Sequence, residues 1–165
     1  YELKREIPRL KLLIAPRHTS RAREVCQKVK GYSCALRSED KEDWDVLVID
    51  TLGELFDFYS LGDVVFVGGT LVPIGGHNLL EPVYHQKPVV FGKHIHKVWD
   101  VASYLIERNA GFMAKTPEEL REVMRKLLTG ELKFTKLNLT EESKKIKECY
   151  LRHIKGLLLH SEGSL

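Results

Sequence analysis

The chain has 165 residues, of which 43% are hydrophobic and 30% charged, and its 26 basic and 23 acidic side chains leave a net charge of +3. This length fits one domain with its own core, and the composition excludes the low hydrophobicity that is typical of intrinsic disorder. Because the charge is small and mixed along the chain, we expect no nucleic-acid partner and no binding to an anionic membrane through bulk charge.

Apolar runs alternate along the chain with segments of helical patterning. The predicted strands are residues 11–15, 33–36, 45–50, 63–67, 88–91 and 111–114. The predicted helices are residues 20–30, 53–60, 78–85, 98–108 and 117–128. For the last helix, Thr116 serves as a cap and Pro117 takes the first helical position, followed by acidic residues in the first turn.

The strand runs LVID and VVFVGG are apolar without alternation, which indicates strands that are buried on both faces. Helices must then cover both sides of a parallel sheet, and the repeating order of strand and helix predicts a doubly wound, Rossmann-like α/β fold. Ligands of such folds bind beyond the carboxyl ends of the strands. Four unusual loops, residues 15–19, 50–54, 68–78 and 91–96, follow predicted strands and meet at that edge.

The chain divides by composition into four parts. Residues 1–9 are charged and contain a proline, as expected of a linker, and residues 10–139 form the α/β domain. Residues 140–160 form an amphipathic helix, and 161–165 are a polar tail. The apolar stripe of this helix consists of Ile146, Cys149, Tyr150, His153, Ile154, Leu157 and Leu158. This stripe packs either on the sheet of its own domain or on another domain or chain.

The chain has three cysteines, Cys26, Cys34 and Cys149, an odd number without CxxC spacing. This argues against a disulfide framework and against a zinc ribbon, and favours a reducing compartment. The chain has no apolar run near the roughly 20 residues that span a bilayer, and it does not open with a signal peptide. Any membrane contact of this segment is therefore expected to be peripheral.

The glycine-rich stretch after the strand at 63–67 is the strongest local signal. Gly68-Gly69 is followed by Gly75-Gly76-His77-Asn78, which opens a predicted helix that carries Glu81. Glycines allow the backbone to approach a ligand closely, and the start of a helix adds unpaired N–H groups, so the stretch suits an anion. Glu81 would then reach ribose hydroxyls. The alternative is a tight turn that needs glycine for its geometry alone.

Two further loops point to the same edge. Arg17 in the sequence APRH follows the first strand, where a guanidinium can bind phosphate or carboxylate in a bidentate manner. DTLGEL at residues 50–55 adds a hydroxyl, a glycine and another helix start after the third strand. An isolated arginine is usually a surface charge, but three such loops at one edge favour an anion-binding site.

Three segments of the chain closely resemble the C-terminal half of bacterial 3-deoxy-D-manno-octulosonic acid (Kdo) transferases: APRH at 15–18, DTLGEL at 50–55 and FVGGTLVPIGGHNLLEP at 66–82. The resemblance covers nearly the whole chain. It implies one domain of a GT-B glycosyltransferase, in which two Rossmann-like domains face each other and the second binds the nucleotide sugar. These enzymes transfer Kdo from CMP-Kdo to a lipid A precursor in lipopolysaccharide biosynthesis.

The resemblance implies a set of donor-binding residues on the three loops: Arg17, His18, Thr51, Leu52, Gly53, Gly75, Gly76, His77, Asn78 and Glu81. Arg17 and His18 would face the donor phosphate or the Kdo carboxylate. The run 75–78 would cradle the phosphate, and Glu81 would hold the cytidine ribose. Neither a metal nor another cofactor is expected, because a helix start and an arginine can stabilise the charge that grows on CMP.

The resemblance also implies that this chain is half of an inverting enzyme. The family's N-terminal domain, with its acceptor site, membrane-contacting surface and proposed catalytic carboxylate, has no counterpart here, and the helix at 140–160 would pack toward that domain. The intact enzyme is then expected at the cytoplasmic face of the bacterial inner membrane, peripheral or monotopic, and this segment by itself to be soluble. Alone, the segment would be a CMP-binding or CMP-Kdo-binding module without transferase activity. The other alternative to a Kdo transferase is another GT-B nucleotide-sugar transferase.

Other functions find less support in the sequence. His94 and His96, with His85 upstream, suggest a metal site, but their loop has no matching cysteine or carboxylate cluster. The chain has neither a G-x-S-x-G nor a G-x-x-x-x-G-K-[ST] motif, which disfavours hydrolases and kinases. The first strand is followed by PRHTSR rather than by a G-x-G-x-x-G turn, which disfavours dinucleotide oxidoreductases.

Overall fold

The computed structural model describes residues 1–75, 78–144, 148 and 151. The strands are β1 (Leu12–Ile14), β2 (Cys34–Leu36), β3 (Val46–Val48), β4 (Val65–Phe66), β5 (Val89–Phe91) and β6 (Gly111–Met113). The α-helices are α1 (Glu2–Glu6), α2 (Ala22–Lys28), α3 (Leu55–Phe58), α4 (Leu80–Tyr84), α5 (Trp99–Glu107) and α6 (Pro117–Thr129). The described residues also form the short 3-10 helices η1 (Thr19–Arg21), η2 (Arg37–Glu39) and η3 (Tyr59–Leu61).

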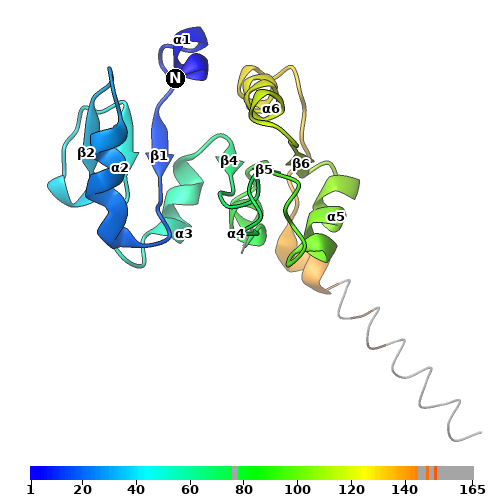
Figure 1. Cartoon of the computed structure of the whole chain (residues 1–165). Coiled ribbons are helices and arrows are strands. Elements are labelled where there is room, and N and C mark those ends of the chain that lie inside the picture. The colour runs from blue at the N-terminus through cyan, green and yellow to red at the C-terminus, as the bar shows by residue number, and fades with distance from the viewer. Residues whose placement is uncertain (76–77, 145–147, 149–150, 152–165) are drawn as a thin grey trace, which may run out of the picture.

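All of these strands pair in parallel, which confirms the predicted α/β class. They form two three-stranded sheets, with orders β1-β3-β2 and β4-β5-β6, rather than one hydrogen-bonded sheet. In the view of Figure 1 the labelled strands follow one another from β2 through β1 and β4 to β5 and β6. β4 has only two residues and pairs with β5, so β1 and β4 are the edge strands where the two sheets adjoin.

The first sheet is covered on one face by α2. Leu36, Val46 and Val48 form a buried cluster with Ala22, and Val25 packs against it from the next turn of the helix. The alternation along each strand sends these side chains toward α2, because successive residues of a strand point to opposite faces. Burial of this apolar area fixes where α2 starts, directly after the loop that carries Arg17.

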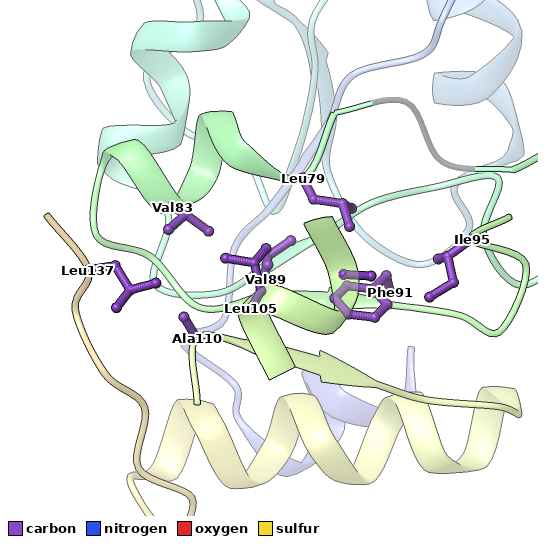
Figure 2. Packing of buried hydrophobic residues seen from close by; sticks show 9 residues of the cluster. Leu79, Val83, Val89, Phe91, Ile95, Leu105, Ala110 and Leu137 are labelled. Atoms are coloured by element: carbon purple, nitrogen blue, oxygen red, sulfur yellow. The ribbon is translucent and has the colours of Figure 1, made fainter. Parts of the chain in front are cut away.

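The second sheet holds the main core, which Figure 2 shows from close by. Val89 and Phe91 of β5 are fully buried against Leu105 of α5, and against Leu79 and Val83 from the α4 segment. On the other face of β5, Val90 packs against residues of α6 and the segment that follows it. β5 is therefore buried on both faces, and this explains its unbroken apolar sequence.

The helix predicted at 117–128 is confirmed as α6. The Thr116 hydroxyl accepts a hydrogen bond of 3.1 Å from the Glu119 backbone N–H, and Pro117 takes the first helical position. Gly130 ends the helix with a φ of +78°, in the left-handed region. Because capping depends on residues that are close in sequence, this helix could be predicted almost to the residue.

The segment predicted as a linker, residues 1–9, contains helix α1. Lys4 pairs with Asp45 at 2.9 Å, just before β3, and Arg121 of α6 pairs with Glu2 at 3.1 Å and with Glu6 at 3.3 Å. The hydrogen bond from Lys4 is the main reason why the pKa of Asp45 is lowered. α1 therefore contacts both halves of the fold through ion pairs, whereas its charged composition had predicted a linker.

Cys26 of α2 and Cys34 of β2 are joined by a disulfide bond, so the inference against disulfides is wrong for this pair. That inference used the number and spacing of the cysteines, whereas the pairing arises because α2 packs on β2 and brings the two side chains together. The argument for a reducing compartment loses its support with it. Cys149 lies outside the described residues.

We expect reduction of this disulfide to lower the free energy of unfolding by about 2 kcal/mol, because it closes a short loop in the unfolded chain. Urea denaturation with and without a phosphine reductant measures the difference. A Cys149→Ser variant should behave in the same way, whereas a Cys26→Ser/Cys34→Ser variant should not respond to the reductant. Alkylation of all three cysteines in the air-oxidised, denatured protein would contradict the pairing.

The chain after α6 returns to α5. Residues 139–144 are helical, and the Tyr104 hydroxyl donates a hydrogen bond of 2.7 Å to Glu142. Most of the amphipathic helix predicted at 140–160, and the polar tail at 161–165, lie outside the described residues. Within the part of the chain that is described, none of the helices has the length and hydropathy needed to cross a bilayer.

Candidate functional site

The candidate site is built from four loops that follow β1, β3, β4 and β5. Because neighbouring strands are parallel in each sheet, the carboxyl ends of β1 and β3 share one edge, and so do those of β4 and β5. The described residues of these loops are 15–18, 49–54, 67–75 with 78–79, and 92–98. The candidate residues that the structure describes therefore lie on post-strand loops or, in the case of Glu81, on the first turn of a helix.

Arg17 and His18 lie between β1 and η1, and both are exposed. The His18 backbone carbonyl accepts a hydrogen bond of 3.0 Å from the Arg21 N–H, which fixes the turn after Arg17. Among the described residues, no carboxylate lies within ion-pair distance of the Arg17 guanidinium. Its charge and its planar set of N–H donors are thus presented to solvent, where they suit an anion.

The loop after β3 is fixed by carboxylates. Asp50 accepts a hydrogen bond of 2.9 Å from the Ser38 N–H and another from the Ser38 hydroxyl, and the latter is the main cause of its lowered pKa. The Thr51 hydroxyl donates to Glu54, which also pairs with Arg37 at 3.5 Å. The Thr51 proton is therefore used within the loop, and only its lone pairs remain for a ligand.

The next two residues of this loop project outward. Leu52 is 86% exposed. Gly53 has a φ of +80°, and a Cβ placed on it would meet no atom within 4 Å. Glycine is the residue that most readily adopts this left-handed conformation, and the open space around Gly53 leaves its backbone groups accessible. The loop is thus able to offer backbone contacts to a ligand.

The turn after β4 is anchored by Thr70, which is 0% exposed. Its hydroxyl donates to the Val67 carbonyl at 2.7 Å and accepts from the Gly92 N–H at 2.7 Å, and its carbonyl accepts from the His94 N–H at 2.8 Å. A Cβ on Gly92 would lie 2.3 Å from the Thr70 carbonyl oxygen. The loops after β4 and β5 are therefore held together by buried hydrogen bonds.

The sequence predicted Asn78 as the first residue of a helix, but Asn78 lies before α4. Its side-chain oxygen accepts hydrogen bonds from the N–H groups of Leu80 at 2.9 Å and Glu81 at 3.3 Å, so Asn78 caps α4. The helix consequently begins at Leu80 and not at 78, because a capping residue lies outside the helix that it caps. Gly76 and His77, the other two residues in the middle of the predicted cradle, lie outside the described residues.

Glu81 lies in the first turn of α4 and is partly buried. Its charge raises the pKa of the Tyr59 phenol, which burial raises in the first place. Tyr59 belongs to η3, and α4 packs on η3, so Glu81 lies on a helix that contacts the segment following α3 and the loop of residues 51–54.

The sequence analysis placed the loop of residues 91–96 at the carboxyl edge but gave His96 a role only in the alternative metal site, and it did not consider Lys97. Gly75 has a φ of +83°, and a Cβ on it would lie 3.3 Å from His96 Cε1 and 3.5 Å from Lys97 Cδ. These two side chains therefore lie directly against the turn at Gly75, which is called the glycine turn below. The signal that could have revealed them is their position on a fourth loop at the carboxyl edge of the strands.

The residues of the alternative metal site are used in other ways. His85 lies at the end of α4, where its ring packs 4.5 Å from that of Phe56, and its Nε2 atom is buried without a hydrogen-bond partner. The His94 backbone N–H donates a hydrogen bond to the Thr70 carbonyl. In the described part of the chain, no three histidine, cysteine, aspartate or glutamate side chains are grouped so that they could hold a metal ion.

The chain is similar in sequence to known proteins. The chain is 35% identical over 157 residues to the 3-deoxy-D-manno-octulosonic acid transferase of Aquifex aeolicus, an alignment that covers 95% of this chain and 44% of that protein. The transferase of Chlamydia muridarum is 38% identical over 74% of this chain and 30% of its own length. The chain thus spans less than half the length of these relatives. A scan against protein-family models finds no match.

A solved structure is also similar. The crystal structure of the C-terminal CMP-Kdo binding domain of WaaA from Acinetobacter baumannii superposes with a TM-score of 0.71 and 30% sequence identity. The match covers 78% of this chain and 69% of that domain.

Proposed function

This chain belongs to the Kdo transferase family, and from that premise we propose that it is the donor-binding part of an enzyme that transfers Kdo from CMP-Kdo to a lipid A precursor. The observation that carries the proposal is the similarity to a CMP-Kdo binding domain, at 30% identity and a TM-score of 0.71. The exposed Arg17, the open backbone at Gly53 and the position of Glu81 beside η3 support it.

The proposed chemistry is the stabilisation of a leaving group. When the bond between the sugar and the phosphate breaks, negative charge grows on CMP, and a positioned guanidinium such as that of Arg17 offsets it. Glu81 accepts hydrogen bonds from the ribose hydroxyls and so fixes the nucleotide, and the backbone of residues 51–53 adds contacts to it. The acceptor hydroxyl attacks the opposite face of the anomeric carbon, and the base that takes its proton belongs to another domain of the enzyme.

The further partners follow from the same proposal. The complete enzyme has a GT-B arrangement, with the acceptor and the membrane-contacting surface supplied outside the present residues, and it works at the cytoplasmic face of the bacterial inner membrane. On this proposal the 165-residue chain alone binds the donor or CMP and transfers nothing, because the base and the acceptor site are assigned to other residues of the enzyme. An assay with the chain alone should therefore detect binding without turnover.

Titration calorimetry with the 165-residue chain tests the proposal. We expect CMP to bind at least about tenfold more tightly than UMP or UDP, because a site that pairs with the amino group of cytosine leaves buried polar groups unpaired with uracil. UMP serves as the matched control, since it shares the ribose and the monophosphate with CMP, and UDP shows the effect of a second phosphate. Equal affinity for CMP and UMP, or no binding of CMP, would overturn the proposal.

A further inference from the structure

The loop between β5 and α5, residues 92–98, places two basic side chains against the glycine turn. His96 Cε1 and Lys97 Cδ lie 3.3 and 3.5 Å from the position that a Cβ on Gly75 would take. Gly75 itself is buried, while His96 and Lys97 are exposed. The absence of a side chain at Gly75 thus leaves room for the stem of Lys97 on the turn, and the Lys97 side chain is exposed to solvent.

Hydrogen bonds and core packing hold the backbone of the loop at residues 92–98 in place. Thr70 holds the loop to the turn through the N–H groups of Gly92 and His94, at 2.7 and 2.8 Å. Ile95, between the two histidines, is 1% exposed and belongs to the main core, as Figure 2 shows. The backbone that carries Lys97 is therefore fixed before any ligand binds, which lowers the entropy cost of using its charge.

The charge of Lys97 is not neutralised within the described part of the chain. No carboxylate there lies within ion-pair distance of its ammonium group. Arg17, at the end of β1, is in the same situation. The site therefore presents Arg17 on the loop after β1, and Lys97 together with the exposed Lys93 on the loop after β5, with the turn at Gly75 between the two loops in strand order.

The order of the loops along the sheets assigns different anionic groups of the donor to Arg17 and Lys97. The residues proposed for the nucleotide follow β1, β3 and β4, whereas Lys97 follows β5, the next strand beyond β4. A nucleotide sugar that extends from the first sheet across the turn brings its sugar, not its base, to residues 92–98. Kdo is an acid whose carboxylate is attached to the carbon that is bonded to the phosphate oxygen. The donor therefore carries a second anion next to its phosphate.

We propose that Lys97, supported on Gly75 beside His96, binds the carboxylate of the transferred sugar acid, while Arg17 binds the phosphate. This inference rests on the proposed function and adds the residue that distinguishes an acidic sugar from a neutral one. A donor with an uncharged sugar leaves the ammonium group without its partner, so Lys97 is a specificity residue for the sugar.

The test compares CMP with freshly prepared CMP-Kdo in calorimetric titrations of the 165-residue chain. Lys97→Gln is expected to weaken the binding of CMP-Kdo about tenfold, as for the loss of a charge-assisted hydrogen bond, and to leave that of CMP unchanged. Lys87→Gln removes the same charge at the opposite end of β5 and should change neither affinity. Circular dichroism verifies that both variants are folded.

The outcomes separate the two proposals. CMP binding by the unaltered chain, with its preference over UMP, tests the proposed function alone. The inference on Lys97 depends on the ratio of the two affinities in the variant. If Lys97→Gln weakens CMP and CMP-Kdo by the same factor, Lys97 binds the phosphate, and if it weakens neither, Lys97 does not contact the donor. Either result overturns the inference while the CMP preference stands.

Discussion

Replacing Gly92 with alanine is expected to destabilise the chain by about 3 kcal/mol or more, in the upper range for overpacking of a buried site. A Cβ at this position would lie 2.3 Å from the Thr70 carbonyl oxygen, 2.4 Å from its carbonyl carbon and 2.6 Å from the Leu71 nitrogen. All three are backbone atoms, so no side chain can rotate away to make room. The hydrogen bond from the Gly92 N–H to the Thr70 hydroxyl must then break or the turn must move.

Urea denaturation followed by circular dichroism measures this loss. Gly68→Ala is the matched control, because Gly68 precedes the same turn and a Cβ there would meet no atom within 4 Å. Its effect should stay within about 1 kcal/mol, the ordinary range for a glycine substitution without strain. A Gly92→Ala variant as stable as the Gly68→Ala variant would contradict the close packing of the two loops.

Glu81→Ala is expected to weaken CMP binding by about 10-fold to 100-fold, because a carboxylate that accepts two ribose hydroxyls contributes charge-assisted hydrogen bonds. The fold should survive, because the cap of α4 is supplied by Asn78, which bonds to the backbone of Leu80 and Glu81 and not to the Glu81 side chain. Calorimetric titration with CMP measures the affinity, and urea denaturation measures the stability of the same variant.

Glu118→Ala is the control for this change. Glu118 also lies in the first turn of a helix, α6, but it is exposed and belongs to no candidate loop, so its removal should leave CMP binding as it is. If Glu81→Ala instead unfolds the chain, Glu81 acts as a structural residue of α4. If the variant binds CMP as tightly as the unaltered chain, Glu81 does not hold the ribose.

The fold could be predicted from the sequence wherever short-range signals are strong. Thr116, Pro117 and Gly130 define α6, and the unbroken apolar run that ends at Phe91 indicated a strand buried on both faces. The start of α4 was predicted two residues too early, because Asn78 is compatible with a helix in its first turn and with a cap before it. Only the hydrogen bonds distinguish the two.

The candidate site could be predicted in part for the same reason. Arg17 and residues 51–53 follow apolar runs directly, so their place on post-strand loops was evident from the sequence. Lys97 was not found, since its contact with Gly75 joins loops that are separated by two other elements, α4 and β5. The pairing of Cys26 with Cys34 also depends on packing, that of α2 on β2.

The sequence by itself determined the type and order of the elements, the edge where the glycines and Arg17 occur, and the resemblance to Kdo transferases. These features depend on residues that are neighbours along the chain, because hydrophobic periodicity and caps act over one or two turns. The tertiary structure alone decided that the strands form two sheets, that α1 is paired with both halves, and that Thr70 and Gly75 bring the loop of Lys97 to the turn. Those features depend on which apolar faces bury one another, and residues distant in sequence meet only when that burial is complete.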